Sequence, residues 1–179
     1  MQEHEDSIII DRVKQGDTDC FEHLVNRYQK RLHVYIVNLI RDREKAEDIL
    51  QEVFLSAFLH ISSFNRERGS FSTWIHTIAR NRCRNETKKI LTLNPAIDPF
   101  IELEKQPDDH LLKKEIFEKL NTALDQLPFN DRSLFSLYEF EGLSYKEIAW
   151  IEAIDIGTVK SRLSRIRQKL KTLLREYAL

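Results

Sequence analysis

The sequence predicts an all-α protein made of two small helical domains joined by a flexible linker. Of its 179 residues, 41% are hydrophobic, which is enough to build cores, and only four are Gly and four Pro. A β-sandwich needs more turns than so few Gly and Pro support. Three of the four prolines stand close together among acidic side chains, where no helix can persist: Pro95, Pro99 and Pro107. We therefore predict domains over residues 1–90 and 109–179 and a linker over 91–108.

The first helix of the N-terminal domain is predicted from apolar side chains that recur every three or four residues. Asp17 stands just before this run and can cap the helix, which we expect to end near Arg41. The apolar face comprises Phe21, Leu24, Val25, Tyr28, Leu32, Tyr35, Ile36 and Leu39.

Two further helices complete the predicted N-terminal domain. Asp42 can cap a second helix, whose apolar residues continue to Phe58. A polar loop follows over residues 62–70. Ser70 ends this loop and can cap a third helix that runs to about Ile90.

The C-terminal domain begins with two predicted helices. The first spans about 109–126, and Pro128 separates it from a second over about 131–140. Gly142 follows as a residue suited to the left-handed conformation beyond a helix end.

A capping box predicts the next helix. Ser144 and Glu147 have the spacing at which a serine side chain and a glutamate side chain each bond the other's backbone amide. This short helix ends near Ile151 and leads into a tight turn. Asp155 can then cap a last helix that runs to about Tyr177.

The last helix has a narrow apolar face and follows a short capped helix and a tight turn, which is the pattern of a helix-turn-helix. The second helix of that motif enters the major groove of DNA with its N-terminal residues leading. Its apolar face comprises Val159, Leu163, Ile166, Leu170, Leu173 and Leu174.

Basic side chains occupy the rest of this helix, with seven Lys or Arg and no acid between Lys160 and Arg175. Arginine can bond guanine O6 and N7 together, and lysine places charge near phosphates. Five side chains are expected to face DNA: Thr158, Lys160, Ser161, Arg162 and Arg165. The alternative is an ordinary solvated helix over a small core.

A second basic run, with five bases and one acid, extends from Arg80 to Lys89. It follows Phe71 and Trp74 on the same predicted helix. Bases that alternate with aromatic residues suit single-stranded nucleic acid, whose unstacked bases need aromatic surfaces. The alternative is that both aromatic residues belong to the core and the arginines are solvated.

An acidic run from Asp42 to Glu52 contains five acids and two bases. Nothing in it indicates the pocket that catalytic carboxylates need. It is either a solvated helix face or a docking surface for a basic partner.

Several classes of function are not indicated. Cys20 and Cys83 lack the spacing of a metal site, so we expect reduced thiols in the cytoplasm and no metal or cofactor. The longest stretch without charged residues, 53–65, is too short to cross a membrane. Residues 1–6 carry three acids and do not resemble a signal peptide. No enzyme motif is present.

Four strings resemble the extracytoplasmic-function (ECF, group 4) class of sigma-70 family sigma factors. Gly142–Ala149 and Gly157–Arg167 resemble region 4, Ala46–Phe54 resembles region 2.2, and Phe71–Asn81 resembles regions 2.3–2.4. The resemblance implies a transcription initiation factor that binds core RNA polymerase and directs it to promoters by their −10 and −35 elements. The alternative is a free-standing helix-turn-helix regulator that acts without polymerase.

The resemblance also implies roles for residues of the N-terminal domain. Asp48, Gln51 and Glu52 would dock on the clamp helices of the polymerase β′ subunit. Six residues are implied in capture of a flipped base from the −10 element: Phe64, Asn65, Phe71, Trp74, Arg80 and Asn81.

For the C-terminal domain, the resemblance implies docking on the β flap and recognition of the −35 element as duplex DNA. The residues implied in that recognition are Ser144, Tyr145, Lys146, Thr158, Lys160, Ser161, Arg162 and Arg165. An anti-sigma partner is also implied.

The chain departs from the family pattern at two positions of the turn. The family usually has Gly where this chain has Ala153, and Pro or Ser where it has Asp155. Since a positive φ is strained for alanine, we expect a slightly different turn here.

Overall fold

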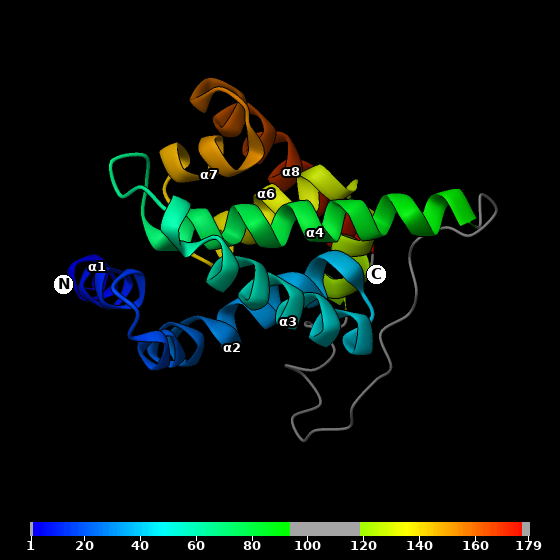
Figure 1. The fold of residues 1–179 in the computed structure, drawn as a ribbon. Coiled ribbons are helices and arrows are strands. Elements are labelled where there is room, and N and C mark those ends of the chain that lie inside the picture. The colour runs from blue at the N-terminus through cyan, green and yellow to red at the C-terminus, as the bar shows by residue number, and fades with distance from the viewer. Residues whose placement is uncertain (1, 94–118, 177–179) are drawn as a thin grey trace, which may run out of the picture. The chain divides into compact units, whose positions relative to one another are not determined.

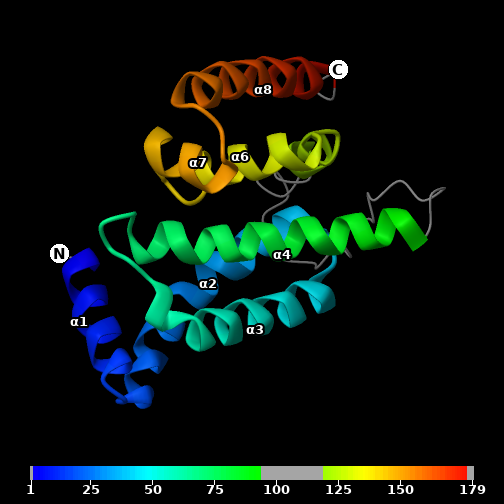
Figure 2. The ribbon, with the colours of Figure 1, turned by 45° about the horizontal axis from the view of Figure 1, so that its top comes forward.

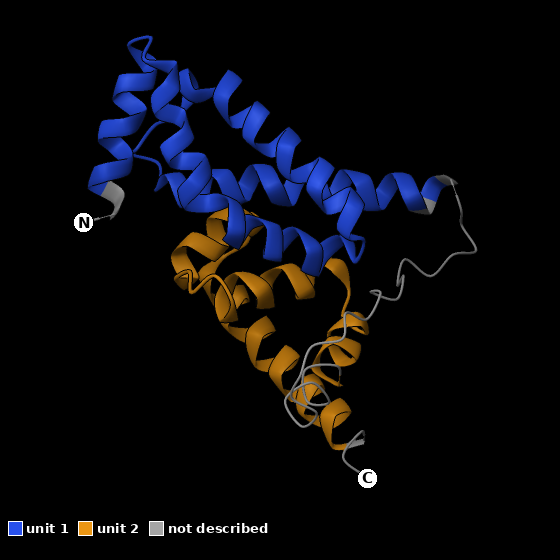
Figure 3. Cartoon of the chain, turned by 90° about the horizontal axis from the view of Figure 1, so that it is seen from below, with its two compact units in different colours: residues 1–99 blue, residues 100–179 orange. Residues whose placement is uncertain are grey.

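The computed structural model describes residues 2–93 and 119–176 and divides into two compact units, Met1–Pro99 and Phe100–Leu179 (Figures 1 and 3). Within the described residues all regular structure is helical, as predicted. The division falls inside the predicted linker, most of which lies outside the described residues.

The described residues of the first unit form four α-helices and two short 3-10 turns. The elements are α1 (Gln2–Lys14), η1 (Thr18–Cys20), α2 (Phe21–Ile40), α3 (Arg43–Leu59), η2 (Ile61–Ser63) and α4 (Phe71–Leu93). Helices α2, α3 and α4 pack against one another, and α1 lies at the end of this bundle where α4 begins (Figure 2). The core is formed by fully buried side chains such as Leu24, Leu32, Ile36, Val53 and Ile75.

Two predicted helix caps of this unit are confirmed. The Asp42 carboxylate accepts a hydrogen bond of 3.0 Å from the Lys45 amide. Ser70 Oγ accepts one of 3.1 Å from the Thr73 amide. These side chains satisfy amides that the first turn of a helix leaves without backbone partners.

The predicted cap at Asp17 is wrong. A 3-10 turn precedes α2, and the Asp17 side chain bonds no amide of that turn. Its Oδ2 atom instead accepts bonds from Cys20 Sγ at 3.2 Å and from Arg12 Nη2 at 2.6 Å. These two bonds lower the pKa of Asp17.

The second unit contains helical residues 119–125 and three further helices, α6 (Phe129–Glu139), α7 (Tyr145–Glu152) and α8 (Ile156–Glu176). Residues 109–118 of the first predicted helix lie outside the described residues. Helices α6, α7 and α8 pack around a core that includes Leu134, Leu137, Ile148, Val159, Leu163 and Ile166. Gly142 follows α6 with φ +66°, as expected for its position.

The capping box at the start of α7 is confirmed. Ser144 Oγ accepts a bond of 3.3 Å from the Glu147 amide, and Glu147 Oε2 accepts one of 2.9 Å from the Ser144 amide. The backbone carbonyl of Asp155 accepts a bond of 3.1 Å from the Val159 amide, so Asp155 stands at the predicted start of α8.

The expectation of a different turn at Ala153 is wrong. Ala153 adopts the left-handed conformation, with φ 53° and ψ 48°. Its amide donates to Trp150 O at 3.3 Å, and the Ile154 amide donates to Ala149 O at 3.0 Å. These two bonds form a Schellman motif, which holds alanine in a conformation that glycine adopts without strain.

Candidate nucleic-acid and polymerase interface

The predicted docking residues lie on one exposed face of α3. The side chains of Asp48, Gln51 and Glu52 are all exposed. One and two helical turns further along the same face lie Leu55 and Leu59, with exposed fractions of 59% and 64%. These leucines lie outside the apolar face predicted for this helix, and no role was predicted for them from the sequence. We call these five residues the docking face.

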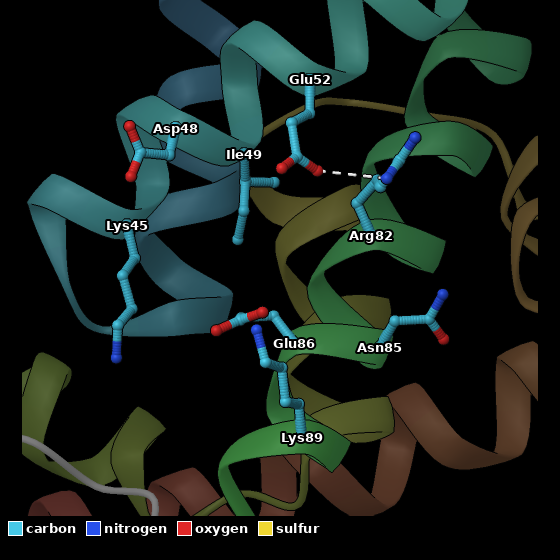
Figure 4. Close-up of a pocket in the computed structure, with 8 residues that line it drawn as sticks. All are labelled: Lys45, Asp48, Ile49, Glu52, Arg82, Asn85, Glu86 and Lys89. Atoms are coloured by element: carbon cyan, nitrogen blue, oxygen red, sulfur yellow. Dashed lines mark hydrogen bonds and ion pairs between the residues drawn. The ribbon is translucent and has the colours of Figure 1, made fainter.

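A shallow hollow of about 250 Å³ lies between α3 and α4 beside the docking face (Figure 4). Across it, Glu52 Oε2 accepts a hydrogen bond of 3.1 Å from Arg82 Nη1. The lining residues are Lys45, Asp48, Ile49, Glu52, Arg82, Asn85, Glu86 and Lys89. The mixture of charges makes this hollow a surface for polar contacts rather than an apolar ligand site.

An aromatic cluster joins the loop before α4 to the bundle. The Phe64 ring centroid lies 5.8 Å from that of Phe71 and 5.4 Å from that of Trp74. Phe71 also meets the Tyr28 ring at 5.3 Å. Phe64 and Phe71 are buried, with 8% and 2% of their surface exposed, whereas Trp74 is half-buried. Phe71 is therefore a core residue, and Trp74 keeps an accessible surface.

The other residues implied in −10 recognition also divide into buried and exposed. Arg80 is buried, while Asn65 and Asn81 are exposed. Asn65 Oδ1 accepts a 2.8 Å bond from the Glu67 amide, which shapes the loop locally. The accessible members of the set are therefore Asn65, Trp74 and Asn81.

The basic run on α4 forms an exposed face beyond the buried Arg80. Its members recur at helical spacing, so they lie on one side of the helix. They are Asn81, Arg82, Arg84, Asn85, Lys88 and Lys89, all of them exposed. This basic face follows directly from the aromatic cluster along α4, an arrangement that suits a strand whose bases are unstacked.

A contact from α1 was not predicted from the sequence. Lys14 Nζ donates a 2.7 Å hydrogen bond to the backbone carbonyl of Phe64, 50 positions further along the chain. No periodic pattern signals this contact, because it depends on how α1 packs against the bundle.

The predicted DNA-facing residues of the helix-turn-helix in the second unit differ in their exposure to solvent. Lys146, Lys160, Ser161 and Arg165 are exposed, and Thr158, Arg162 and Tyr145 are half-buried. Ser144 is also exposed, but its hydroxyl is engaged in the capping box.

Stacked tyrosines lie on one flank of α8. The rings of Tyr138 and Tyr145 are 5.2 Å apart, and Lys160 Nζ lies 5.8 Å from the Tyr145 centroid. The hydrogen bond between the two hydroxyls is the main cause that lowers the pKa of Tyr138, and the bond with Arg167 lowers it further. The bond between the hydroxyls also raises the pKa of Tyr145. Arg167 covers the Tyr138 ring and is bonded to Glu139 at 2.7 Å. This arginine is therefore engaged within the unit.

Two predicted residues share a hollow on the other flank of α8. Arg162 and Arg165 line a depression of about 350 Å³ together with Asn130 and Asp131, which come from the first turn of α6. The two flanks thus place Lys160 and Arg162 on different sides of the helix, with Ser161 between them on the outer surface.

The described residues contain no group of three or more His, Cys, Asp or Glu side chains that could hold a metal ion. Cys20 and Cys83 are both buried as free thiols. Burial raises the pKa of both thiols, which disfavours the reactive thiolate. Among the described residues, no helix is long and apolar enough to cross a membrane.

A helix-turn-helix with a basic second helix, and a separate bundle with acidic and basic-aromatic faces, define a DNA-binding transcription protein. The chain matches the family models for Sigma-70 region 2 over residues 24–90 and for Sigma-70, region 4 over residues 117–170. RNA polymerase sigma-H factor of Pseudomonas aeruginosa is 32% identical over 98% of this chain and 99% of its own length. ECF RNA polymerase sigma-E factor of Escherichia coli is 31% identical over 92% of each chain.

Solved structures agree with this assignment. The sigma factor RpoE, from its complex with the anti-sigma factor NepR of Bartonella quintana, has a TM-score of 0.74 and 26% identity, covering 87% of this chain and 96% of that chain. CnrH, from its complex with the cytosolic domain of CnrY, has a TM-score of 0.72, and the match covers 94% of this chain and 96% of CnrH. Its sequence identity is 21%, so this match shows a similarity of fold alone. The chain belongs to the sigma-70 family of RNA polymerase sigma factors, in its extracytoplasmic-function class. It is a transcription initiation factor.

Proposed function

We propose that this sigma factor docks on the β′ clamp helices of core RNA polymerase through the docking face of α3. Asp48 and Glu52 supply negative charge, Gln51 supplies hydrogen bonds, and Leu55 and Leu59 supply apolar area. The support is the continuous exposure of these side chains on one helix face. Acidic residues beside exposed leucines suit a partner with a basic and apolar surface.

The first unit is further proposed to hold the single-stranded −10 element. Asn65, Trp74 and Asn81 supply accessible polar and aromatic surface for a flipped base. Phe64, Phe71 and Arg80 support the pocket from beneath, because they are buried. The basic face of α4 follows the phosphates of the same strand.

The second unit is proposed to read the −35 element as duplex and to dock on the β flap. Ser161 lies on the outer surface of α8, with Lys160 on one flank and Arg162 and the exposed Arg165 on the other. Thr158, Lys146, Tyr145 and Ser144 complete the set near the groove entrance. The protein supplies recognition, and the chemistry of transcription belongs to the polymerase.

An anti-sigma partner in the cytoplasm is also proposed, since the related RpoE is known in complex with the anti-sigma factor NepR. Such a partner competes with polymerase if it covers the docking face. The two separate units, each with its own core, allow a partner to engage both.

The test is transcription from a promoter library with purified core RNA polymerase. The proposal predicts that the protein binds core enzyme and that transcripts start downstream of shared −10 and −35 sequences. Duplex binding without core enzyme, and no promoter-specific transcription with it, would instead support a free-standing regulator.

A further inference from the structure

Helix α1 is tied to α2 by side chains other than those that contact the loop over residues 61–70. Asp6 is buried and accepts hydrogen bonds from Arg27 and from the Tyr28 hydroxyl. Ile10 and Val13 are buried on the inner side of the same helix. Charge-assisted hydrogen bonds and apolar packing hold α1 in a fixed position. Its last turn can therefore position another segment of the chain.

That last turn holds the loop over residues 61–70 at two points. Lys14 Nζ donates to Phe64 O at 2.7 Å and lies 5.8 Å from the centroid of the Phe64 ring. Asp11 approaches Arg66 with 3.9 Å between Oδ2 and Nη1. The first contact is part-buried and short, whereas the second joins exposed side chains and contributes little.

The carbonyl that Lys14 holds belongs to the peptide bond between Phe64 and Asn65. The peptide unit is planar, so a bond that holds its oxygen also restricts the orientation of its plane. That plane sets the direction in which the chain enters Asn65. Phe64 precedes this peptide bond, and its ring packs on Trp74. The Lys14 bond therefore helps to orient both Asn65 and the aromatic pair of Phe64 and Trp74.

We propose that Lys14 is a positioning residue for −10 base selection. It acts through the Phe64 carbonyl and holds the loop so that Asn65 and Trp74 present one pocket geometry to a flipped base. The inference rests on the proposed role of this loop in −10 recognition. Lys14 lies outside the residues that match the region 2 family model, which begin at residue 24.

The experiment uses the full chain bound to core polymerase. The probe is a single-stranded oligonucleotide with the −10 sequence that the unmodified protein selects from a promoter library, in four versions that differ at the flipped base. Lys14→Met keeps the length of the side chain and removes the donor. Lys14→Arg keeps a donor, and Lys30→Met makes the same charge change at an exposed lysine of α2.

Lys14→Met is expected to reduce the preference for the selected base about tenfold, because a hydrogen bond from a charged group is lost. The melting temperature and the affinity for core enzyme should stay near those of the unmodified protein. Lys14→Arg should recover part of the preference, and Lys30→Met should keep all of it.

An unchanged base preference in Lys14→Met would overturn the proposal. If this variant melts earlier, the preference is measured at a temperature where both proteins are folded, and an equal preference there also overturns it. If the Lys14→Arg variant is folded but shows no stronger base preference than Lys14→Met, the hydrogen bond donated by Lys14 is not what sets the preference, and the proposal is wrong. If the unmodified protein itself prefers no base, the proposed −10 function fails instead.

Discussion

Glu52 on α3 and Arg82 on α4 form an ion pair with 3.1 Å between carboxylate and guanidinium atoms. Glu52 belongs to the docking face and Arg82 to the basic face, so the pair joins the two surfaces proposed for polymerase and for DNA. Both side chains are about half exposed, at 56% and 46%. An exposed pair of this kind contributes about 0–1 kcal/mol. A partner that binds Glu52 can therefore release Arg82 for a DNA phosphate at little cost.

Replacement of Arg82 tests its proposed contact with DNA. Arg82→Ala should change the free energy of unfolding by less than about 1 kcal/mol, since only an exposed pair is lost. If Arg82 neutralises one phosphate of the single strand, the slope of log K against log salt should become shallower by about 0.7. The slope is measured by titration of the −10 strand with polymerase-bound protein. An unchanged slope would show that Arg82 meets no phosphate.

Replacement of Arg165 tests the recognition helix. Arg165→Ala should weaken binding of the −35 duplex by about 1–3 kcal/mol if a bidentate contact with guanine is lost, and Arg162→Ala tests the flank beside it. Arg167→Ala is the matched control, because Glu139 and Tyr138 already engage that arginine. Transcription is measured at a −35-dependent promoter. Normal transcription by both Arg162→Ala and Arg165→Ala would contradict the groove assignment.

The aromatic cluster predicts different outcomes for two neighbouring residues. Phe71→Ala removes a buried ring and should destabilise the first unit by about 3–5 kcal/mol. Trp74→Ala removes a half-exposed ring, so this variant should stay folded and fail to open promoter DNA. Circular dichroism melting and a promoter-opening assay separate these effects. A folded Trp74→Ala variant that opens DNA normally would remove Trp74 from the pocket.

The left-handed alanine in the turn predicts a stabilising substitution. Ala153→Gly relieves backbone strain of about 1–2 kcal/mol. Glycine also makes the unfolded chain more flexible, which costs a smaller amount of stability, about 0.4–1 kcal/mol. The net gain should raise the melting temperature of the second unit by a few degrees, about 4–8 °C for each kcal/mol in a domain of this size. A lower melting temperature would mean that the Ala153 methyl group is itself stabilising.

Most features made by residues close together in the sequence could be predicted, although the side-chain bonds of Asp17 and the left-handed turn at Ala153 were not. The caps at Asp42 and Ser70 and the capping box of Ser144 with Glu147 depend on groups three positions apart. The buried face of α8 follows from spacing alone. Local composition also indicated the exposed basic and acidic faces.

Features made by distant segments could not be predicted. In α1, Ile8, Ile9 and Ile10 are consecutive and point in different directions, so no apolar face is visible in the sequence; only Ile10 is fully buried among them. The burial of Phe64 and the exposure of part of Trp74 depend on how α1 and the loop pack. Nothing in the sequence indicated that Phe64 would be buried and that Trp74 would be partly exposed.

Polymerase docking through α3 is tested most directly by the affinity of a charge-reversed protein for core RNA polymerase. Asp48→Lys combined with Glu52→Lys places positive charge against a basic surface. The affinity for core enzyme should therefore fall about 100-fold or more, while the helical circular dichroism stays normal. Asp19→Lys combined with Glu22→Lys makes the same charge change at exposed sites outside α3 and should leave the affinity unchanged. Unaltered binding of the Asp48 and Glu52 variant, or an equal loss in the control, would contradict docking through this face.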